Sequence, residues 1–304
     1  MITFVPDRKE NGMKFLKATG VSALLLALAG GVFTGVFKYM QNAQSPRQVV
    51  KTDGAKVVVE ELSFFNDMDK YYGKIYKPAD TSGTHPVLIF CHGIGATADW
   101  GETYCRTAAS RGFYAYAFDF RGGSPDSRSS GKTTDMSVET EKEDLLFILK
   151  RIRREPFTDR SKVFVMGHSQ GGLVAALAAK EARRQIAGLV LLAPAFNIPD
   201  FSRELYPKTG KIPETTDLFG TAAGKRYFTD VRNLDPYKWL ARFQQPVLLI
   251  HGDQDQTVPF SYVEKAFECY GMAELEILEG AGHSFDGYAD EVRERMAAWL
   301  DRRI

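Results

Sequence analysis

The sequence reads KVFVMGHSQGGLVAALAAKEAR from Lys162 to Arg183, and this stretch decides the fold. Its first part, Val163–Met166, is a short apolar run typical of a strand that is buried on both faces of a sheet. Its last part is rich in alanine and is typical of a helix. Between them, Gly167-His168-Ser169-Gln170-Gly171 fits the pattern G-x-S-x-G, in which a strand turns sharply into a helix and small neighbours make room for a strained serine. The pattern predicts that the hydroxyl of Ser169 is exposed beside the N-terminal end of a helix.

A serine hydroxyl becomes a useful nucleophile only beside a general base. The chain has 5 histidines, and His283 is the one in a flexible turn, Gly280-Ala281-Gly282-His283-Ser284-Phe285, just after the last predicted strand. The other four, His85, His92, His168 and His251, adjoin strands or lie in glycine turns, where a role in holding loops is expected. The sequence therefore predicts His283 as the base.

A carboxylate that orients the base is expected between the serine and the histidine along the chain. The predicted strand Val247–Ile250 is followed by two candidates, Asp253 and Asp255. Asp255 is favoured because a turn that Val258 can anchor starts there, whereas Asp253 is expected to brace the same turn. A metal site built from His251, Asp253 and Asp255 lacks a fourth ligand, so no metal is expected.

An oxyanion formed at the serine needs two donors. One is expected to be the backbone N–H of Gln170, directly after the serine. The other is expected from the glycine-containing loop His92-Gly93-Ile94-Gly95-Ala96, which follows the apolar run Val87–Cys91. We predict the N–H of Ile94 as this second donor.

Strand-like and helix-like segments alternate along most of the chain, which predicts a mostly parallel sheet covered by helices on both faces. The predicted strands are 57–64, 72–76, 87–91, 113–118, 163–166, 188–192, 247–250 and 275–278, and the predicted helices are 138–153, 171–183, 260–269 and 290–302. The alternation stops at about 195–243, a segment with four prolines and many aromatic residues. We predict that this segment forms a cap inserted over the active edge of the sheet. Asp200, Tyr206 and Tyr227 are its candidate substrate-binding residues.

The composition is that of a folded protein with no large basic field. Of the 304 residues, 44% are hydrophobic and 25% are charged, and the formal net charge is +1. This balance argues against nucleic acid as a partner. Three cysteines, Cys91, Cys105 and Cys269, form neither a disulfide framework nor a zinc pattern, and the pairing of Cys91 with Cys105 stays open.

The N-terminal region contains a nearly unbroken apolar stretch, Ala18 to Phe37, which Lys14 and Lys17 precede. As a helix it would span about 30 Å, enough to cross a bilayer. The same stretch fits a cleaved signal peptide, and Met13 is an alternative to Met1 as the start. We therefore predict a signal or membrane anchor with its linker over 1–45 and one folded domain over 46–304. The basic N-terminal flank predicts an extracytoplasmic domain, membrane-anchored or secreted.

Taken together, these motifs resemble the α/β-hydrolase superfamily from about Val57 to the C-terminus, and within it the feruloyl (cinnamoyl) esterase group of carboxylesterases. The matching features are His92-Gly93-Ile94, Asp119-Phe120-Arg121-Gly122-Gly123, Gly167-His168-Ser169-Gln170-Gly171-Gly172, His251-Gly252-x-x-Asp255-x-x-Val258 and Gly282-His283. One stretch differs, since Gly123-Ser124-Pro125-Asp126-Ser127-Arg128 stands where the group usually has G-H-G-x-S.

The resemblance implies an eight-stranded α/β-hydrolase sheet with an inserted cap, and a serine hydrolase that forms an acyl-enzyme without any cofactor. It implies a small-molecule ester as substrate, of the feruloyl or cinnamoyl type or with a short acyl chain. A lipid-directed enzyme, such as a monoacylglycerol lipase or lysophospholipase, is the alternative that the apolar N-terminal segment suits. A membrane-tethered binding module that performs no chemistry is the alternative outside enzymes.

Overall fold

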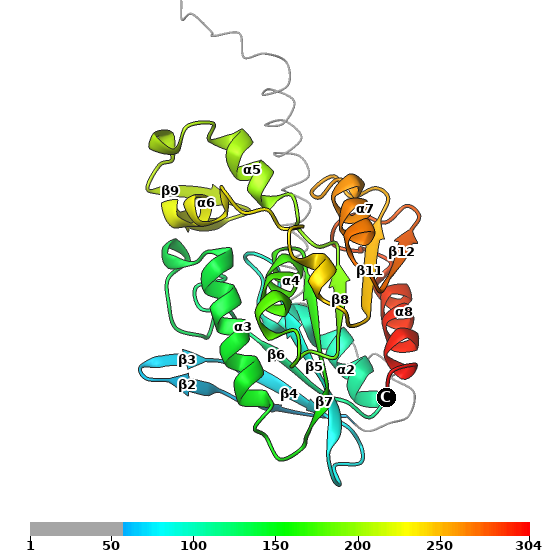
Figure 1. Cartoon of the computed structure of the whole chain (residues 1–304). Helices are drawn as coiled ribbons and strands as arrows, with labels where there is room; N and C mark the ends of the chain where they lie inside the picture. Colours follow the sequence, from blue (N-terminus) through cyan, green and yellow to red (C-terminus); the bar gives the residue numbers. More distant parts are fainter. Residues whose placement is uncertain (1–56) are drawn as a thin grey trace, which may run out of the picture.

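The computed structural model describes residues 57–304, which form a central sheet with helices on both faces (Figure 1). The sheet has eight strands, and all neighbouring pairs are parallel except those that involve β4. The predicted α/β-hydrolase architecture is thereby confirmed. In spatial order the strands are β1 (Val58–Glu61), β4 (Gly73–Lys77), β6 (Tyr114–Phe118), β5 (His85–Cys91), β7 (Thr158–His168), β8 (Gly188–Leu192), β11 (Val247–Gly252) and β12 (Ala273–Leu278).

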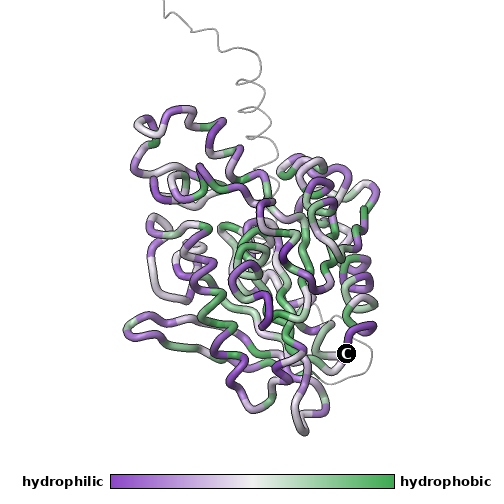
Figure 2. The backbone as a smooth tube through the Cα atoms, in the orientation of Figure 1, coloured by the Kyte–Doolittle hydropathy of each residue, from purple (hydrophilic) through white to green (hydrophobic). Residues whose placement is uncertain are grey.

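The sheet separates two apolar cores. Successive side chains of a strand point to opposite faces, and in β5 Val87 and Ile89 pack into one core whereas Leu88 and Phe90 pack into the other. The central strands are accordingly the most hydrophobic part of the molecule in Figure 2. On the first face lie α3 (Val138–Ile152), α4 (Gln170–Ala182) and α7 (Phe260–Cys269), and on the second lie α2 (Glu102–Ser110) and α8 (Ala289–Asp301).

Two parts of the structure differ from the elements that we expected. The single strand expected over 57–64 ends at Glu61, and Phe64 begins a separate hairpin, β2 (Phe64–Asn66) with β3 (Asp69–Tyr71). The hairpin turns at Asp67, whose φ of 52° lies in the left-handed region that aspartate tolerates. Helix α2 was not predicted, because it is short and four of its five buried residues are small.

The segment between β8 and β11 forms a separate layer, which we call the cap (residues 195–243). It contains α5 (Ile198–Leu205), the hairpin of β9 (Thr215–Leu218) and β10 (Thr221–Gly224), and α6 (Lys225–Val231). In Figure 1, α5, β9 and α6 lie together beyond α3 and α4, at the end of the molecule opposite α8. A side-chain hydrogen bond fastens α6 to the main fold, since the hydroxyl of Ser137 donates to Asp230 at 2.7 Å.

The two outermost strands carry glutamates. In β12, Glu274 and Glu276 form ion pairs with arginines of the C-terminal region, and in β1 Glu60 pairs with Lys77. Between residues 57 and 304, no helix has the length and apolarity needed to cross a bilayer. The predicted N-terminal signal or anchor lies outside the described residues. All three cysteines are free thiols, so Cys91 and Cys105 do not pair.

Candidate active site

Ser169 lies at the sharp turn between β7 and α4. Its backbone has φ 55° and ψ −122°, a strained conformation for a residue with a side chain. Its glycine neighbours leave no room for larger residues. A Cβ atom on Gly167 would lie 2.2 Å from the carbonyl oxygen of Gly171, and one on Gly171 would lie 2.3 Å from the carbonyl oxygen of Cys91. The G-x-S-x-G pattern is therefore a steric requirement of this turn.

The structure brings Ser169, His283 and Asp255 into one hydrogen-bonded chain. Nε2 of His283 lies 2.9 Å from the hydroxyl oxygen of Ser169, and Nδ1 of His283 lies 2.8 Å from Oδ2 of Asp255. These residues are separated by 86 and 28 positions in the sequence, and they meet because each follows the carboxyl end of a strand. The arrangement allows His283 to accept the proton of Ser169 while Asp255 holds the imidazole.

Asp255 is held in its charged form. Burial opposes its ionisation, but His283 and the N–H of Val258 outweigh burial and lower the pKa of the carboxyl below its usual value. Oδ1 accepts hydrogen bonds from the N–H groups of Thr257 and Val258, each at 2.8 Å. The turn that we expected from the sequence thus fixes one oxygen and leaves the other for the imidazole.

Asp253, the alternative acid, points elsewhere. Its Oδ1 accepts a hydrogen bond from the N–H of Gly280 at 2.7 Å, so it braces the loop that carries His283. Nε2 of His251 lies 3.0 Å from the carbonyl oxygen of Val258, so His251 braces the turn that begins at Asp255. In the region 57–304, no three metal-binding side chains gather into a group that could hold an ion.

The loop that carries Ile94 lies directly against Ser169. A Cβ atom on Gly93 would lie 3.1 Å from Cβ of Ser169. In the described part of the chain, the backbone N–H groups of Ile94 and Gln170 donate to no other residue. Both predicted donors are therefore available to an oxygen bound beside Ser169.

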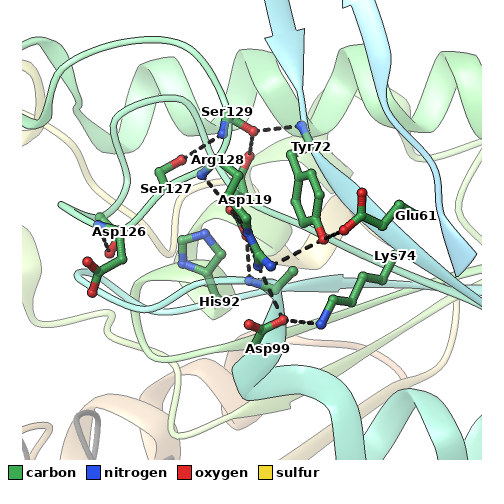
Figure 3. Close-up of polar contacts among 12 residues, drawn as sticks. Glu61, Tyr72, Lys74, His92, Asp99, Asp119, Asp126, Ser127, Arg128 and Ser129 are labelled. Carbon is green, nitrogen blue, oxygen red and sulfur yellow. Dashed lines mark hydrogen bonds and ion pairs between the residues drawn. The ribbon is translucent and has the colours of Figure 1, made fainter. Parts of the chain in front are cut away.

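The segment 119–129, which includes the stretch that differs from the usual family pattern, makes polar contacts around this loop, and Figure 3 shows those of Asp119 and Arg128. The carboxylate of Asp119, which is fully buried, accepts from the N–H of Ala98 at 2.8 Å and forms an ion pair with Arg128. The hydroxyl of Ser124 donates to the carbonyl oxygen of Gly95 at 3.0 Å, and Gly95 donates its N–H to Gly123 at 2.9 Å. The segment 119–129 thus holds the loop of Ile94 at several points.

Arg128 also connects this segment to the edge of the sheet. Its guanidinium lies over the ring of Tyr72, 4.0 Å from the ring centroid, and pairs with Asp99. Sequence reasoning missed Arg128 and Asp119, because their pairing depends on how two loops meet in the folded chain.

Of the three candidate cap residues, Tyr227 contacts Gln170, the residue that follows Ser169. Its hydroxyl donates to the side-chain oxygen of Gln170 at 2.8 Å. The hydroxyl of Tyr206 lies 2.7 Å from that of Thr216 within the cap, and Asp200 accepts from the hydroxyl of Tyr262 in α7 at 2.9 Å. Asp200 and Tyr206 thus bond to residues of the cap and of α7, and not to Ser169 or Gln170.

Sequence reasoning also missed Glu141, which accepts a hydrogen bond from the side-chain nitrogen of Gln170 at 2.8 Å and is fully buried. The spacing of residues in the sequence does indicate that Glu141 is buried. Glu141 is spaced by three and four residues from Val138 and Leu145, so it lies on the apolar face of the predicted helix.

Comparisons with known proteins agree with this geometry. The family model described as "Serine aminopeptidase, S33" matches residues 83–230. The chain is 24% identical over 161 residues to "Uncharacterized peptidase YtmA" of Bacillus subtilis, an alignment that covers 51% of this chain and 56% of YtmA. It is 25% identical over 312 residues to "Uncharacterized protein YqkD" of the same organism, which covers 95% of this chain and 97% of YqkD.

Among solved structures, Est1E from Butyrivibrio proteoclasticus with bound ferulic acid superposes with a TM-score of 0.75 and 23% identity, covering 80% of this chain and 98% of that one. Similarity at this identity establishes the fold. Together with the strained serine turn and the family model, this fold supports an α/β-hydrolase of the serine hydrolase type.

Proposed function

We propose that the protein is a carboxylic-ester hydrolase that works through an acyl-enzyme on Ser169. The observation that carries the proposal is the continuous chain from the hydroxyl of Ser169 through His283 to Asp255, with distances of 2.9 and 2.8 Å. The two available N–H groups of Ile94 and Gln170 support it, because an oxyanion needs donors in place before it forms.

In the proposed mechanism, the hydroxyl oxygen of Ser169 attacks the ester carbonyl while Nε2 of His283 takes its proton. The N–H groups of Ile94 and Gln170 stabilise the oxyanion of the tetrahedral intermediate. The C–O bond to the alcohol then breaks, and His283 returns the proton to the leaving oxygen. Water attacks the acyl-enzyme in the same way, which releases the acid and restores Ser169. The mechanism uses no metal and no organic cofactor.

For the substrate we propose esters of aryl-acrylic acids, such as feruloyl or cinnamoyl esters, or esters with short acyl chains. Support comes from the aromatic cap and from the likeness to Est1E, whose structure contains ferulic acid. A monoacylglycerol or lysophospholipid is the alternative, and the apolar stretch from Ala18 to Phe37 favours it. We further propose that the domain acts outside the cytoplasm, anchored or secreted, because Lys14 and Lys17 flank that stretch on its N-terminal side.

The test is covalent labelling of the full chain with a fluorophosphonate, followed by mass spectrometry of the modified residue. We expect one label on Ser169 and none in Ser169→Ala, with equal melting temperatures. A wild-type protein that folds but takes no label would mean a binding module. Hydrolysis rates with methyl ferulate, p-nitrophenyl esters of increasing length, monoacylglycerols and aminoacyl anilides then rank the substrate classes. Turnover that is fastest with the anilide would replace the ester proposal by a peptidase.

A further inference from the structure

The side chain of Gln170 is held from two sides by groups that the triad does not use. Its carboxamide oxygen accepts from the hydroxyl of Tyr227 at 2.8 Å, and its nitrogen donates to Oε2 of Glu141 at 2.8 Å. Tyr227, Gln170 and Glu141 are 3%, 1% and 0% exposed. They come from α6 in the cap, the first turn of α4 and the first turn of α3. The side chain of Gln170 therefore joins α6 of the cap to α3 of the main fold, and the backbone N–H of the same residue is a proposed oxyanion donor.

The cap also contacts the loop that carries Ile94, the other proposed oxyanion donor. Oγ1 of Thr221, in β10, lies 2.7 Å from the position that a Cβ atom on Gly95 would take, and Thr221 is itself buried. Gly95 directly follows Ile94, so the cap contacts the neighbourhoods of both donors. The bond between Ser137 and Asp230 fixes α6 in the same docked position.

Glu141 suits this position as a neutral acid. Its Oε1 atom is buried and has no hydrogen-bond partner in the part of the chain that the structure describes. Burial first, and then the charge of Asp144, raise the pKa of Glu141 well above its ordinary value of 4.5. The other titratable groups near it are Cys91 of β5, Tyr227 of α6 and the buried His92, which lies on the other side of Gly123. Burial lowers the pKa of His92, so its ring is neutral and none of the three is a cation. A protonated Glu141 still accepts from Gln170 and adds no negative charge behind the oxyanion.

From these contacts we infer that Glu141 and Tyr227 are positioning residues that hold the carboxamide of Gln170 from two sides and so couple the docked cap to the oxyanion hole. The inference rests on the proposed function, because it assigns the N–H of Gln170 to the oxyanion. Loss of either bond leaves the triad in place but frees the first turn of α4. A donor that shifts by a fraction of an ångström stabilises the transition state less, while ground-state binding of a small ester changes little.

Tyr227→Phe tests the cap side of this coupling, with Tyr237→Phe as the matched control. Both variants remove one cap hydroxyl, but that of Tyr227 contacts Gln170 whereas that of Tyr237 donates to the carbonyl oxygen of Tyr262. With p-nitrophenyl acetate, which is too small to need the cap, we expect kcat to fall about tenfold in Tyr227→Phe with KM unchanged. Tyr237→Phe should match the wild type. If Tyr227→Phe raises KM for methyl ferulate and leaves the kcat for the acetate unchanged, Tyr227 binds substrate and the coupling is wrong.

Glu141→Gln and Glu141→Leu test the other side. Glutamine keeps an uncharged acceptor for Gln170, whereas leucine removes it. We expect kcat within about twofold of the wild type for Glu141→Gln and about tenfold lower for Glu141→Leu, with KM unchanged in both. If Glu141→Leu does not fold, a double-mutant cycle of Tyr227→Phe and Gln170→Met decides. Because Gln170→Met already removes the carboxamide that Tyr227 contacts, adding Tyr227→Phe should have no further effect on kcat. Additive effects, or wild-type kcat in Glu141→Leu, would overturn the inference.

The rate of fluorophosphonate labelling separates this inference from the proposed function, because phosphonylation of Ser169 also builds negative charge in the oxyanion hole. A wild type that labels without hydrolysing any ester refutes the ester proposal. In that case, slower labelling of Tyr227→Phe than of Tyr237→Phe still supports the coupling, and equal rates refute it. A wild type that does not label refutes both.

Discussion

Nε2 of His168 lies 3.0 Å from the backbone carbonyl oxygen of His283. The residue before the proposed nucleophile is therefore tied to the residue that carries the proposed base. Burial, and then the nearby His283, lower the pKa of His168 to about 3, so its ring stays neutral and Nε2 can donate this bond. The ring also stacks on Trp100, with centroids 4.0 Å apart.

His168→Phe should keep the stacking on Trp100 and lose the bond to the base loop. We expect kcat/KM for p-nitrophenyl acetate to fall about tenfold, since His283 then loses one of its anchors. His85→Phe is the control, because His85 bonds to the carbonyl groups of Ser82 and Gly112 and to no residue of the triad. Equal rates in His168→Phe and the wild type would show that the other contacts suffice to position the base.

Asp255→Asn should lower kcat about ten-thousand-fold, because an amide cannot stabilise the imidazolium that forms on His283. Asp253→Asn should retain most of the rate, since its carboxamide oxygen can still accept from Gly280. Steady-state kinetics of the two purified variants check this. A severe loss in Asp253→Asn beside a near-normal Asp255→Asn would reverse the assignment of the acid.

Gly171→Ala should destabilise the fold by about 3 kcal/mol or more, because the new methyl group would lie 2.3 Å from the carbonyl oxygen of Cys91. Gly210→Ala is the matched change, with no atom within 4 Å of the new methyl group. Thermal unfolding should show a drop of several degrees for the first variant and almost none for the second. Equal melting temperatures would mean that the turn adapts.

Glu141 should make the stability of the wild type depend on pH. Its folded pKa lies above the ordinary 4.5, so the folded state keeps a proton that the unfolded chain has already lost. The resulting stabilisation is complete below pH 4.5 and is lost as the pH rises towards the raised pKa. Melting temperatures across this interval should therefore fall more steeply for the wild type than for Glu141→Gln. Parallel curves for the wild type and Glu141→Gln would mean that the carboxyl of Glu141 is already ionised in the folded protein. The control is Glu139→Gln, at an exposed site, which should follow the wild type.

Arg128→Met should cost about 3–5 kcal/mol of stability, because it leaves the buried carboxylate of Asp119 without its counter-charge. Lys77→Met removes a more exposed pair with Glu60 and should cost no more than about 1 kcal/mol. Chemical denaturation of both variants gives the comparison. A small effect at Arg128 would mean that the N–H groups around Asp119 are enough to stabilise it.

The sequence predicted the sheet and the meeting of Ser169 with His283 because local patterns determine both. A buried strand followed by glycines and an alanine-rich helix defines the turn at Ser169, and the chain order of the fold places the acid and the base. The role of Glu141 was not predicted, because a charged residue in a helix usually faces water. The ion pair of Asp119 with Arg128 was missed for a different reason, since it depends on the meeting of two loops that have no periodic pattern.

The strands at both edges of the sheet carry charge where another chain would have to dock. Added β-structure on β12 would bring its main chain against Glu274 and Glu276, and added structure on β1 would meet Glu60 and Glu61. Charged side chains on an edge strand disfavour pairing with another chain, because they would lose part of their hydration beside the added strand. The sheet is thus protected against growth from either side, so concentrated preparations should resist fibril formation even though the central strands are strongly apolar.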